Sequence, residues 1–179
     1  MKIYECTAAI EPDQPRAVAV GVFDGLHLGH RAVISRMLAV SAEQGLIPCV
    51  LTFDMHIQNR IMRREAFEAN LREMGVKNLI RLPFDTVREL SPERFAEDIL
   101  GKILNTKAIF CGSNFRFGKG AAADVRELRE LGEVCGFLVE ALPLLEHNRE
   151  PISSTRIRLC IKQGNTQDAS TMLGGQANE

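Results

Sequence analysis

The chain has 179 residues, 45% of them hydrophobic and 25% charged, so it is long enough to bury the core of one globular domain. Its formal net charge of −1 excludes a global field that attracts nucleic acid or an anionic membrane, and one Tyr with no Trp provides little stacking for single strands. The N-terminus lacks the long apolar core of a signal peptide and no apolar run is long enough to span a bilayer. We therefore expect neither nucleic acid nor a membrane as a partner.

The cysteines are scattered and form no C-x-x-C pair. They stand at Cys6, Cys49, Cys111, Cys135 and Cys160. An odd count without a framework is typical of free thiols in a reducing compartment, so we expect a cytoplasmic protein. Most of the five lie inside apolar runs, which predicts that they are small core residues.

Strands and helices are predicted to alternate along the chain. Continuous apolar runs predict strands covered on both faces at residues 17–23, 47–53, 78–82, 108–112 and 137–142. Apolar periodicity, caps and terminal glycines predict helices from about 29 to 45, through Phe67 to Gly75, from Ser91 through Ile103, from about 124 to 136, over 152–164 and over 166–173.

This alternation predicts an α/β fold with a mainly parallel sheet of about five strands and right-handed crossovers. No linker, repeat or low-complexity tract interrupts it, so residues 1–179 are expected to form a single domain. The unusual loops at 24–30, 54–60, 113–123 and 146–155 all follow predicted strands. They should gather at the carboxyl edge of the sheet, where such folds bind ligands near a topological switch.

The segment GVFDGLHLGH joins the first predicted strand to the first predicted helix. The unpaired N–H groups and partial positive charge of a helix start form an anion site, and Gly29 lets a phosphate approach the backbone. His27 and His30 lie one turn apart and can donate to the same anion. Asp24 and Gly25 shape the preceding turn. The pattern favours stabilisation of a phosphate during transfer.

Two other interpretations of this segment stay open. A histidine near a helix start is often a capping or surface residue, and Asp24 can be a simple turn residue. A zinc site would need further ligands, and only Asp24 is locally available, so we expect no metal ligands from the protein.

Several segments together resemble the adenylyltransferase module of the bacterial bifunctional riboflavin kinase/FAD synthetases, within the H-x-G-H nucleotidyltransferase superfamily. They span nearly the whole chain in the family's order: GVFDGLHLGH (21–30), LTFDMH (51–56), LREMGVKNLIRLPFD (71–85), LSPERFAEDIL (90–100), CGSNFRFGKGAAAD (111–124) and ISSTRIR (152–158). The resemblance implies a Rossmann-like, three-layer nucleotidyltransferase fold.

The resemblance also implies a reaction, in which ATP and FMN give FAD and pyrophosphate with Mg2+. The FMN phosphate attacks the α-phosphorus of ATP directly, without a covalent enzyme intermediate. This agrees with the residues themselves, because no nucleophile–base pair stands out. The family's riboflavin kinase domain is absent from residues 1–179, so we expect a separate riboflavin kinase as a partner.

Site residues follow from the same motifs. The resemblance implies catalytic roles for His27, His30, Ser154, Thr155 and Arg158. It implies nucleotide binding by Gly21, Phe23, Asp24, Gly25, Gly29, Gly112, Asn114, Ile152 and Ser153. It implies substrate binding by Phe53, His56, Phe115, Arg116 and Asp124.

Plainer roles are also compatible with several of these residues. Ser153, Ser154 and Thr155 form a second anion site or a simple N-cap, and Arg158 is either a bidentate donor to the β- and γ-phosphates or part of a solvated face. Phe115 and Phe117 are favoured as core residues that support the loop. Asp124 can simply start its helix, His56 can be a surface residue, and Arg116 is a weaker candidate.

Departures from the family pattern motivate two alternative functions. Met55 and Ile57 stand where the family has prolines, which changes a loop that borders the substrate mouth. Ala123 replaces a glycine and would be strained if that position requires a positive φ. The alternatives are a nucleotidyltransferase with another phosphorylated acceptor and a non-catalytic nucleotide- or flavin-binding module.

Overall fold

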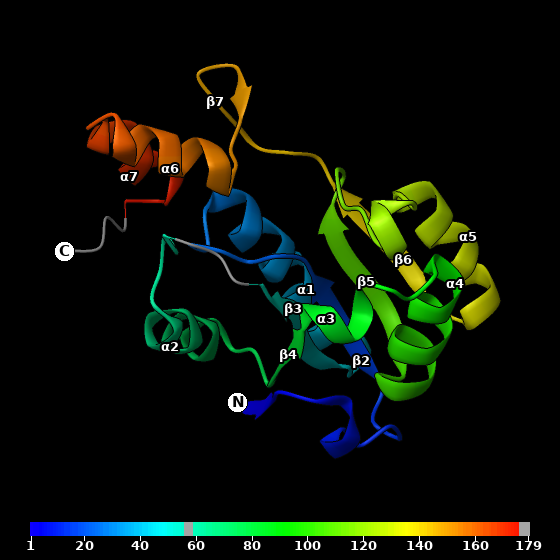
Figure 1. The fold of residues 1–179 in the computed structure, drawn as a ribbon. Helices are drawn as coiled ribbons and strands as arrows, with labels where there is room; N and C mark the ends of the chain where they lie inside the picture. Colours follow the sequence, from blue (N-terminus) through cyan, green and yellow to red (C-terminus); the bar gives the residue numbers. More distant parts are fainter. Residues whose placement is uncertain (56–58, 176–179) are drawn as a thin grey trace.

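A computed structural model describes residues 1–55 and 59–175, and in these residues six strands form one sheet (Figure 1). All neighbouring strands of this sheet run parallel. Their order across the sheet is β1 (Lys2–Tyr4), β4 (Asn78–Pro83), β3 (Ile47–Asp54), β2 (Arg16–Val20), β5 (Thr106–Gly112) and β6 (Leu138–Leu142). The predicted parallel α/β fold is confirmed.

Helices cover both faces of the sheet. One core cluster contains Val18 and Val20 of β2 and packs under η2 and α5, while the other contains Ala17 and Ala19 and packs under α1 and α2. The alternation arises because successive side chains of a strand point to opposite faces. The helices are α1 (Leu28–Gln44), α2 (Arg64–Met74), α3 (Phe84–Val87), α4 (Pro92–Arg94), the π-helix η2 (Phe95–Ile103), α5 (Val125–Cys135), α6 (Ser154–Lys162) and α7 (Thr166–Met172), with 3-10 turns η1 (Thr7–Ala9) and η3 (Lys119–Ala121).

The last two helices form a separate layer at the carboxyl end of the sheet. Ile157 of α6 and Met172 of α7 belong to a third apolar cluster, against which Leu28 and Ile61 pack. Figure 1 shows α6 and α7 lying beyond the first turn of α1. This packing brings the start of α6 next to the start of α1.

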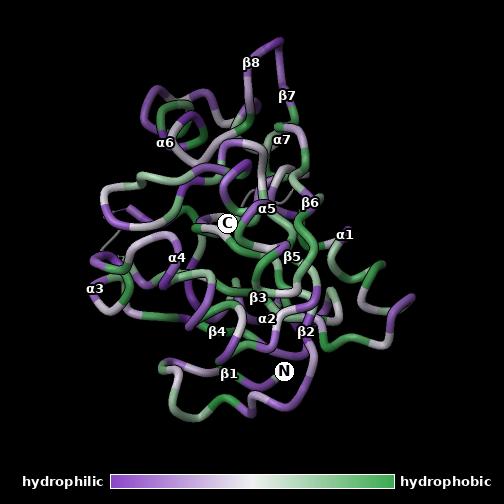
Figure 2. The backbone as a smooth tube through the Cα atoms, turned by 90° about the vertical axis from the view of Figure 1, so that its right-hand side faces the viewer, coloured by the Kyte–Doolittle hydropathy of each residue, from purple (hydrophilic) through white to green (hydrophobic). Residues whose placement is uncertain are grey.

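Short elements differ from the sequence expectation. The strand β1 at the sheet edge and the hairpin of β7 (Glu146–His147) and β8 (Glu150–Pro151) were not expected. The strand predicted at 17–23 ends at Val20 as β2, so the residues after it form a loop. Figure 2 shows hydrophobic residues concentrated on the central strands, whereas the β7–β8 hairpin is largely hydrophilic.

No helix within residues 1–55 and 59–175 combines the length and apolarity that crossing a bilayer requires. Cys49, Cys111 and Cys160 are buried, as predicted, whereas Cys135 is half-buried and Cys6 is exposed.

Candidate active site

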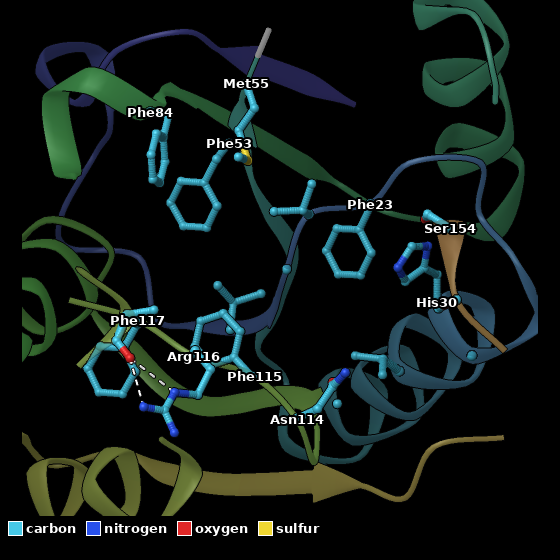
Figure 3. A pocket seen from close by; sticks show the side chains of 18 of the residues that line it. Phe23, His30, Phe53, Met55, Phe84, Asn114, Phe115, Arg116, Phe117 and Ser154 are labelled. Carbon is cyan, nitrogen blue, oxygen red and sulfur yellow. Dashed lines mark hydrogen bonds between the residues drawn. The ribbon is translucent and has the colours of Figure 1, made fainter. Parts of the chain in front are cut away.

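A cavity of about 970 Å³ opens at the carboxyl ends of β2 and β5. These two strands are neighbours, yet the chain first moves outward from β2 through β3 and β4 before it returns to β5. The cavity therefore lies at a topological switch, where ligands of parallel sheets bind. Figure 3 shows His30 and Ser154 at one side of it and an aromatic group at the other.

The start of α1 forms one wall of the polar side. His27 is the N-cap, and its Nδ1 accepts a hydrogen bond from the backbone N–H of His30 at 3.3 Å. The two imidazole rings stack with their centroids 3.6 Å apart. A Cβ on Gly29 would lie 3.2 Å from Cε1 of His27, so glycine gives this ring its space.

Burial makes both imidazoles weak bases. It lowers the pKa of His27 to about 4, although Asp24 acts in the opposite direction. Burial, and then the adjacent His27, hold the pKa of His30 well below its usual value. Nδ1 of His30 is buried without a hydrogen-bond partner among the described residues. Both rings are therefore neutral at pH 7 and can each donate one N–H to a phosphate oxygen.

The start of α6 forms the facing wall. Ser153 caps this helix by accepting a hydrogen bond from the N–H of Arg156 at 3.2 Å. The hydroxyl of Ser154 donates to the backbone carbonyl of Asp24 at 2.9 Å and thereby ties α6 to the loop before α1. Both helices begin at the same cavity, so two positive helix ends face one space.

An ion pair behind this polar wall was not foreseen from the sequence. Nη2 of Arg158 lies 2.5 Å from Oδ2 of Asp24, whose side chain is 3% exposed. The partners are separated by 134 positions, so no local pattern signals their contact.

Gly25 follows Asp24 with φ of 85°, and a Cβ there would lie 2.7 Å from Cγ2 of Ile61.

Aromatic rings line the opposite side of the cavity. Phe53 lies between Phe84 and Phe95, with ring centroids 6.5 Å and 6.2 Å away. Phe115 and Phe117 stack nearly parallel at 5.9 Å. Phe117 also belongs to the buried core, as expected, while both rings face the cavity (Figure 3). Sequence reasoning missed Phe84, because it lies in a helix of four residues after β4.

The loop after β5 borders the cavity between the two sides. Asn114 lines it, and a Cβ on Gly112 would lie 3.0 Å from Oδ1 of Asn114. Arg116 also lines it, but its guanidinium donates to the carbonyl of Ala121 at 3.0 and 2.8 Å. Asp124 forms a capping box at the start of α5 and is not among the lining residues of the described chain. Its simpler role as a helix start is the one observed.

The condition that would strain Ala123 is not met, because Ala123 is not among the described residues with a positive φ. Ala123 is buried and exchanges two backbone hydrogen bonds of 3.1 Å with Phe117. A left-handed conformation occurs instead at Ala121, with φ of 55°. One motive for a non-catalytic module is thereby removed.

Most predicted site residues that the structure describes meet at the cavity. Those lining it are Gly21, Phe23, His27, Gly29, His30, Phe53, Gly112, Asn114, Phe115, Arg116, Ile152, Ser153 and Ser154. Asp24 and Arg158 lie behind the lining, Thr155 is exposed on α6, and His56 lies outside the described residues. Additional lining residues include Met55, Phe84, Leu144 and Leu145.

The described part of the chain contains no group of three or more His, Cys, Asp or Glu side chains placed to hold a metal ion. Asp24, the acid nearest the histidines, is already paired with Arg158. These residues do not fit a resident metal site.

Two helix starts at the switch point of a parallel sheet define an α/β protein of the Rossmann-like nucleotidyltransferase type. Among solved structures, one named as a macrolide-efflux protein from Streptococcus pneumoniae superposes with a TM-score of 0.83, at 26% identity over 96% of this chain and 69% of that one. Pantothenate synthetase from Thermus thermophilus shares the fold, with a TM-score of 0.56 at 16% identity over 99% of this chain and 83% of that one.

Sequence comparison defines the family. A model described as FAD synthetase matches residues 9–156. The chain is 33% identical to the FAD synthetase of Listeria monocytogenes over 97% of this chain and 75% of that protein. It is 30% identical to the bifunctional riboflavin kinase/FMN adenylyltransferase of the same organism, over 90% of this chain and 54% of that protein. This chain belongs to the FAD synthetase family and spans about half the length of the bifunctional relatives.

Proposed function

We propose that the protein is an FMN adenylyltransferase, which converts ATP and FMN into FAD and pyrophosphate. A phosphate oxygen of FMN attacks the α-phosphorus of ATP, and the bond between that phosphorus and the bridging oxygen to the β-phosphate breaks. The observation that carries the proposal is one cavity with two helix N-termini on one side and stacked aromatic rings on the other. Family membership supports the same reaction.

In this proposal the polar side holds the triphosphate of ATP. Backbone N–H groups of the first turns of α1 and α6 donate to phosphate oxygens, as do His27, His30 and the hydroxyl of Ser153. A neutral imidazole fits this role, because its N–H donates without repelling the cationic groups nearby. The hydrogen bonds from these fixed donors become stronger as negative charge develops on the transferring phosphate. A preorganised site lowers the barrier in this way.

The aromatic side suits a flat, largely apolar ring system. Phe53, Phe84 and Phe117 offer faces and edges on which an isoalloxazine ring can stack. A volume of about 970 Å³ is at the upper end for one small ligand and gives room for two substrates. Holding both substrates in one cavity supplies the alignment that in-line transfer needs.

Magnesium enters this proposal as part of the substrate, bound to the phosphates of ATP. In this proposal residues 1–179 act as one adenylyl-transfer domain. A separate riboflavin kinase supplies the FMN. The cytoplasm is the proposed compartment, because the described cysteines are free thiols.

The proposal is tested by incubating the protein with ATP, FMN and magnesium chloride and separating the products by chromatography. The expected result is FAD together with pyrophosphate. No FAD, while a known FAD synthetase works in parallel, would contradict the proposal. Tight ATP and FMN binding without turnover would support a non-catalytic binding module instead.

A different phosphorylated acceptor is the second candidate. Met55 lines the cavity where the family has a proline, so the acceptor side can differ in shape. Release of pyrophosphate, measured across panels of nucleotides and phosphorylated acceptors, separates this candidate from the first.

A further inference from the structure

We propose that Asp24 is a positioning residue that sets Arg158 and Ser154 against the triphosphate. This inference rests on the proposed function only in its assignment of ATP as the nucleotide. Asp24 does not itself touch the substrate, since it lies behind the described lining of the cavity.

Asp24 joins three segments that are distant in the sequence. Oδ2 of its carboxylate binds Arg158 on the second turn of α6. Oδ1 accepts a hydrogen bond from the backbone N–H of Ile61 at 3.1 Å. The backbone carbonyl of Asp24 accepts from the hydroxyl of Ser154 at 2.9 Å. One residue therefore fixes the distance between the start of α6 and the loop that leads into α1.

The guanidinium of Arg158 is only partly used by this contact. Nη2 binds Asp24, whereas Nε is buried and has no hydrogen-bond partner among the described residues. A buried donor without a partner is costly. Arg158 is not among the described residues that line the cavity, so a phosphate oxygen satisfies Nε once this side chain, which is 30% exposed, shifts toward the cavity. Holding one nitrogen leaves the rest of the planar donor group aimed in a fixed direction.

The negative charge of Asp24 has two opposing effects on a triphosphate. At long range it repels the phosphates, which would make its removal strengthen ATP binding. At short range it holds Nη2 of Arg158 in place, so its removal would let the guanidinium turn away from the phosphates and weaken binding. The second effect should dominate, because the two opposite charges of this close pair largely cancel at long range, whereas the contact with a 3% exposed carboxylate still fixes the direction of the guanidinium.

The test compares the affinities for ATP and AMP in Asp24→Asn by calorimetry. Asparagine keeps the acceptor for Ile61 and the backbone carbonyl for Ser154, so the variant should fold, which circular dichroism checks. AMP lacks the β- and γ-phosphates that Arg158 would contact. The preference for ATP over AMP should fall about tenfold or more in Asp24→Asn.

Asp54→Asn is the matched control. Asp54 is a half-exposed acid at the same edge of the sheet and pairs with Arg60 and Arg64 instead of Arg158. Its substitution should leave the ATP-to-AMP preference unchanged.

A double variant decides whether Asp24 acts through Arg158. Arg158→Lys alone should reduce the preference for ATP, and adding Asp24→Asn should reduce it little further. An unchanged or higher preference in Asp24→Asn, or fully additive losses, would overturn the inference. Nucleotide affinities do not depend on FMN turnover, so failure to make FAD leaves this result readable.

Discussion

At the scale of single residues, the stacking of His27 on His30 determines the protonation state of the two imidazoles in the site. Stacked imidazoles 3.6 Å apart cannot both be protonated without strong repulsion, and burial already disfavours the cationic form. The site therefore binds anions with neutral donors and helix ends. Fixed dipoles of this kind do not need to reorganise when charge moves during the reaction.

His30→Ala should reduce turnover by about a hundredfold, because the imidazole contacts the cavity and its lost N–H would no longer stabilise the developing phosphate charge. Steady-state FAD formation measures this loss. His147→Ala is the control, since His147 lies in β7, contacts Asp168 of α7 and is not among the described lining residues of the cavity. A near-normal rate for His30→Ala would remove the assigned role.

Stability should depend on pH through His27. Its pKa falls from 6.5 in the unfolded chain to about 4 in the fold, so the unfolded chain binds more protons between these values. The free energy of unfolding should therefore be highest above pH 6.5 and decline as the pH falls toward about 4.

Urea unfolding at several values between about pH 7 and about pH 4.5 measures this decline. His27→Asn keeps a good N-cap and removes the titrating group, so its profile should be flatter. Equal slopes for the two proteins would show that His27 does not cause the dependence.

At the scale of elements, the loop between β5 and α5 holds its shape with left-handed residues. Gly118 and Gly120 have φ of 76° and 66°, so both favour glycine. Only Gly118 also lies against a neighbour, because a Cβ there would be 2.7 Å from Cγ of Pro92. The two positions also differ in backbone conformation, because ψ is 171° at Gly118 and 20° at Gly120.

Gly118→Ala should destabilise the protein more than Gly120→Ala. An alanine in the left-handed conformation of Gly120 costs about 1–2 kcal/mol. At Gly118 the backbone conformation, with ψ of 171°, costs about 1–3 kcal/mol, and the clash with Pro92 adds about 1–3 kcal/mol. Denaturant unfolding of the two variants side by side gives the difference. Equal losses would show that the backbone at Gly118 and the ring of Pro92 both adjust at little cost.

Sequence patterns predicted the elements that carry strong periodicity and failed on short ones. The apolar run around Val18 predicted a strand buried on both faces, and the sheet covers it on both. The strand β1 has three residues and the strands of the β7–β8 hairpin have two each, too few for any period to appear. These elements are specified by their neighbours more than by their own residues.

The positions of residues at the cavity could be inferred where motifs adjoin strands, and less readily where distant residues meet. His27, Asn114 and Ser153 each follow or precede a regular element, so their place at the sheet edge could be inferred. The pairing of Asp24 with Arg158 required knowledge of how α6 packs, which only the third apolar cluster determines. A contact between residues so far apart in the sequence produces no local sequence pattern from which it could be predicted.

At the scale of the whole molecule, nucleotide binding should stabilise the fold. The cavity joins α1, β5 and α6, so a ligand that fills it links elements from both ends of the chain. With ATP and magnesium at a hundred times the dissociation constant, the gain should be about 2.7 kcal/mol. For a chain of this size, that corresponds to an increase in Tm of roughly 5–10 °C.

Thermal unfolding with and without ATP and magnesium checks this expectation, and chelation of the metal with EDTA should remove most of the shift. No increase in Tm at saturating ATP would argue against the cavity as the nucleotide site.

The hydrogen bond between Ser154 and Asp24 spans 130 positions, and this spacing sets an order of events during synthesis. A ribosome needs on the order of ten seconds to translate such a stretch. Throughout that time the emerging polypeptide contains His27 and His30 but not yet α6, so only one of the two helix starts of the proposed phosphate site is present. Competence to capture a nucleotide thus arrives late in biogenesis, after the sheet has had time to assemble.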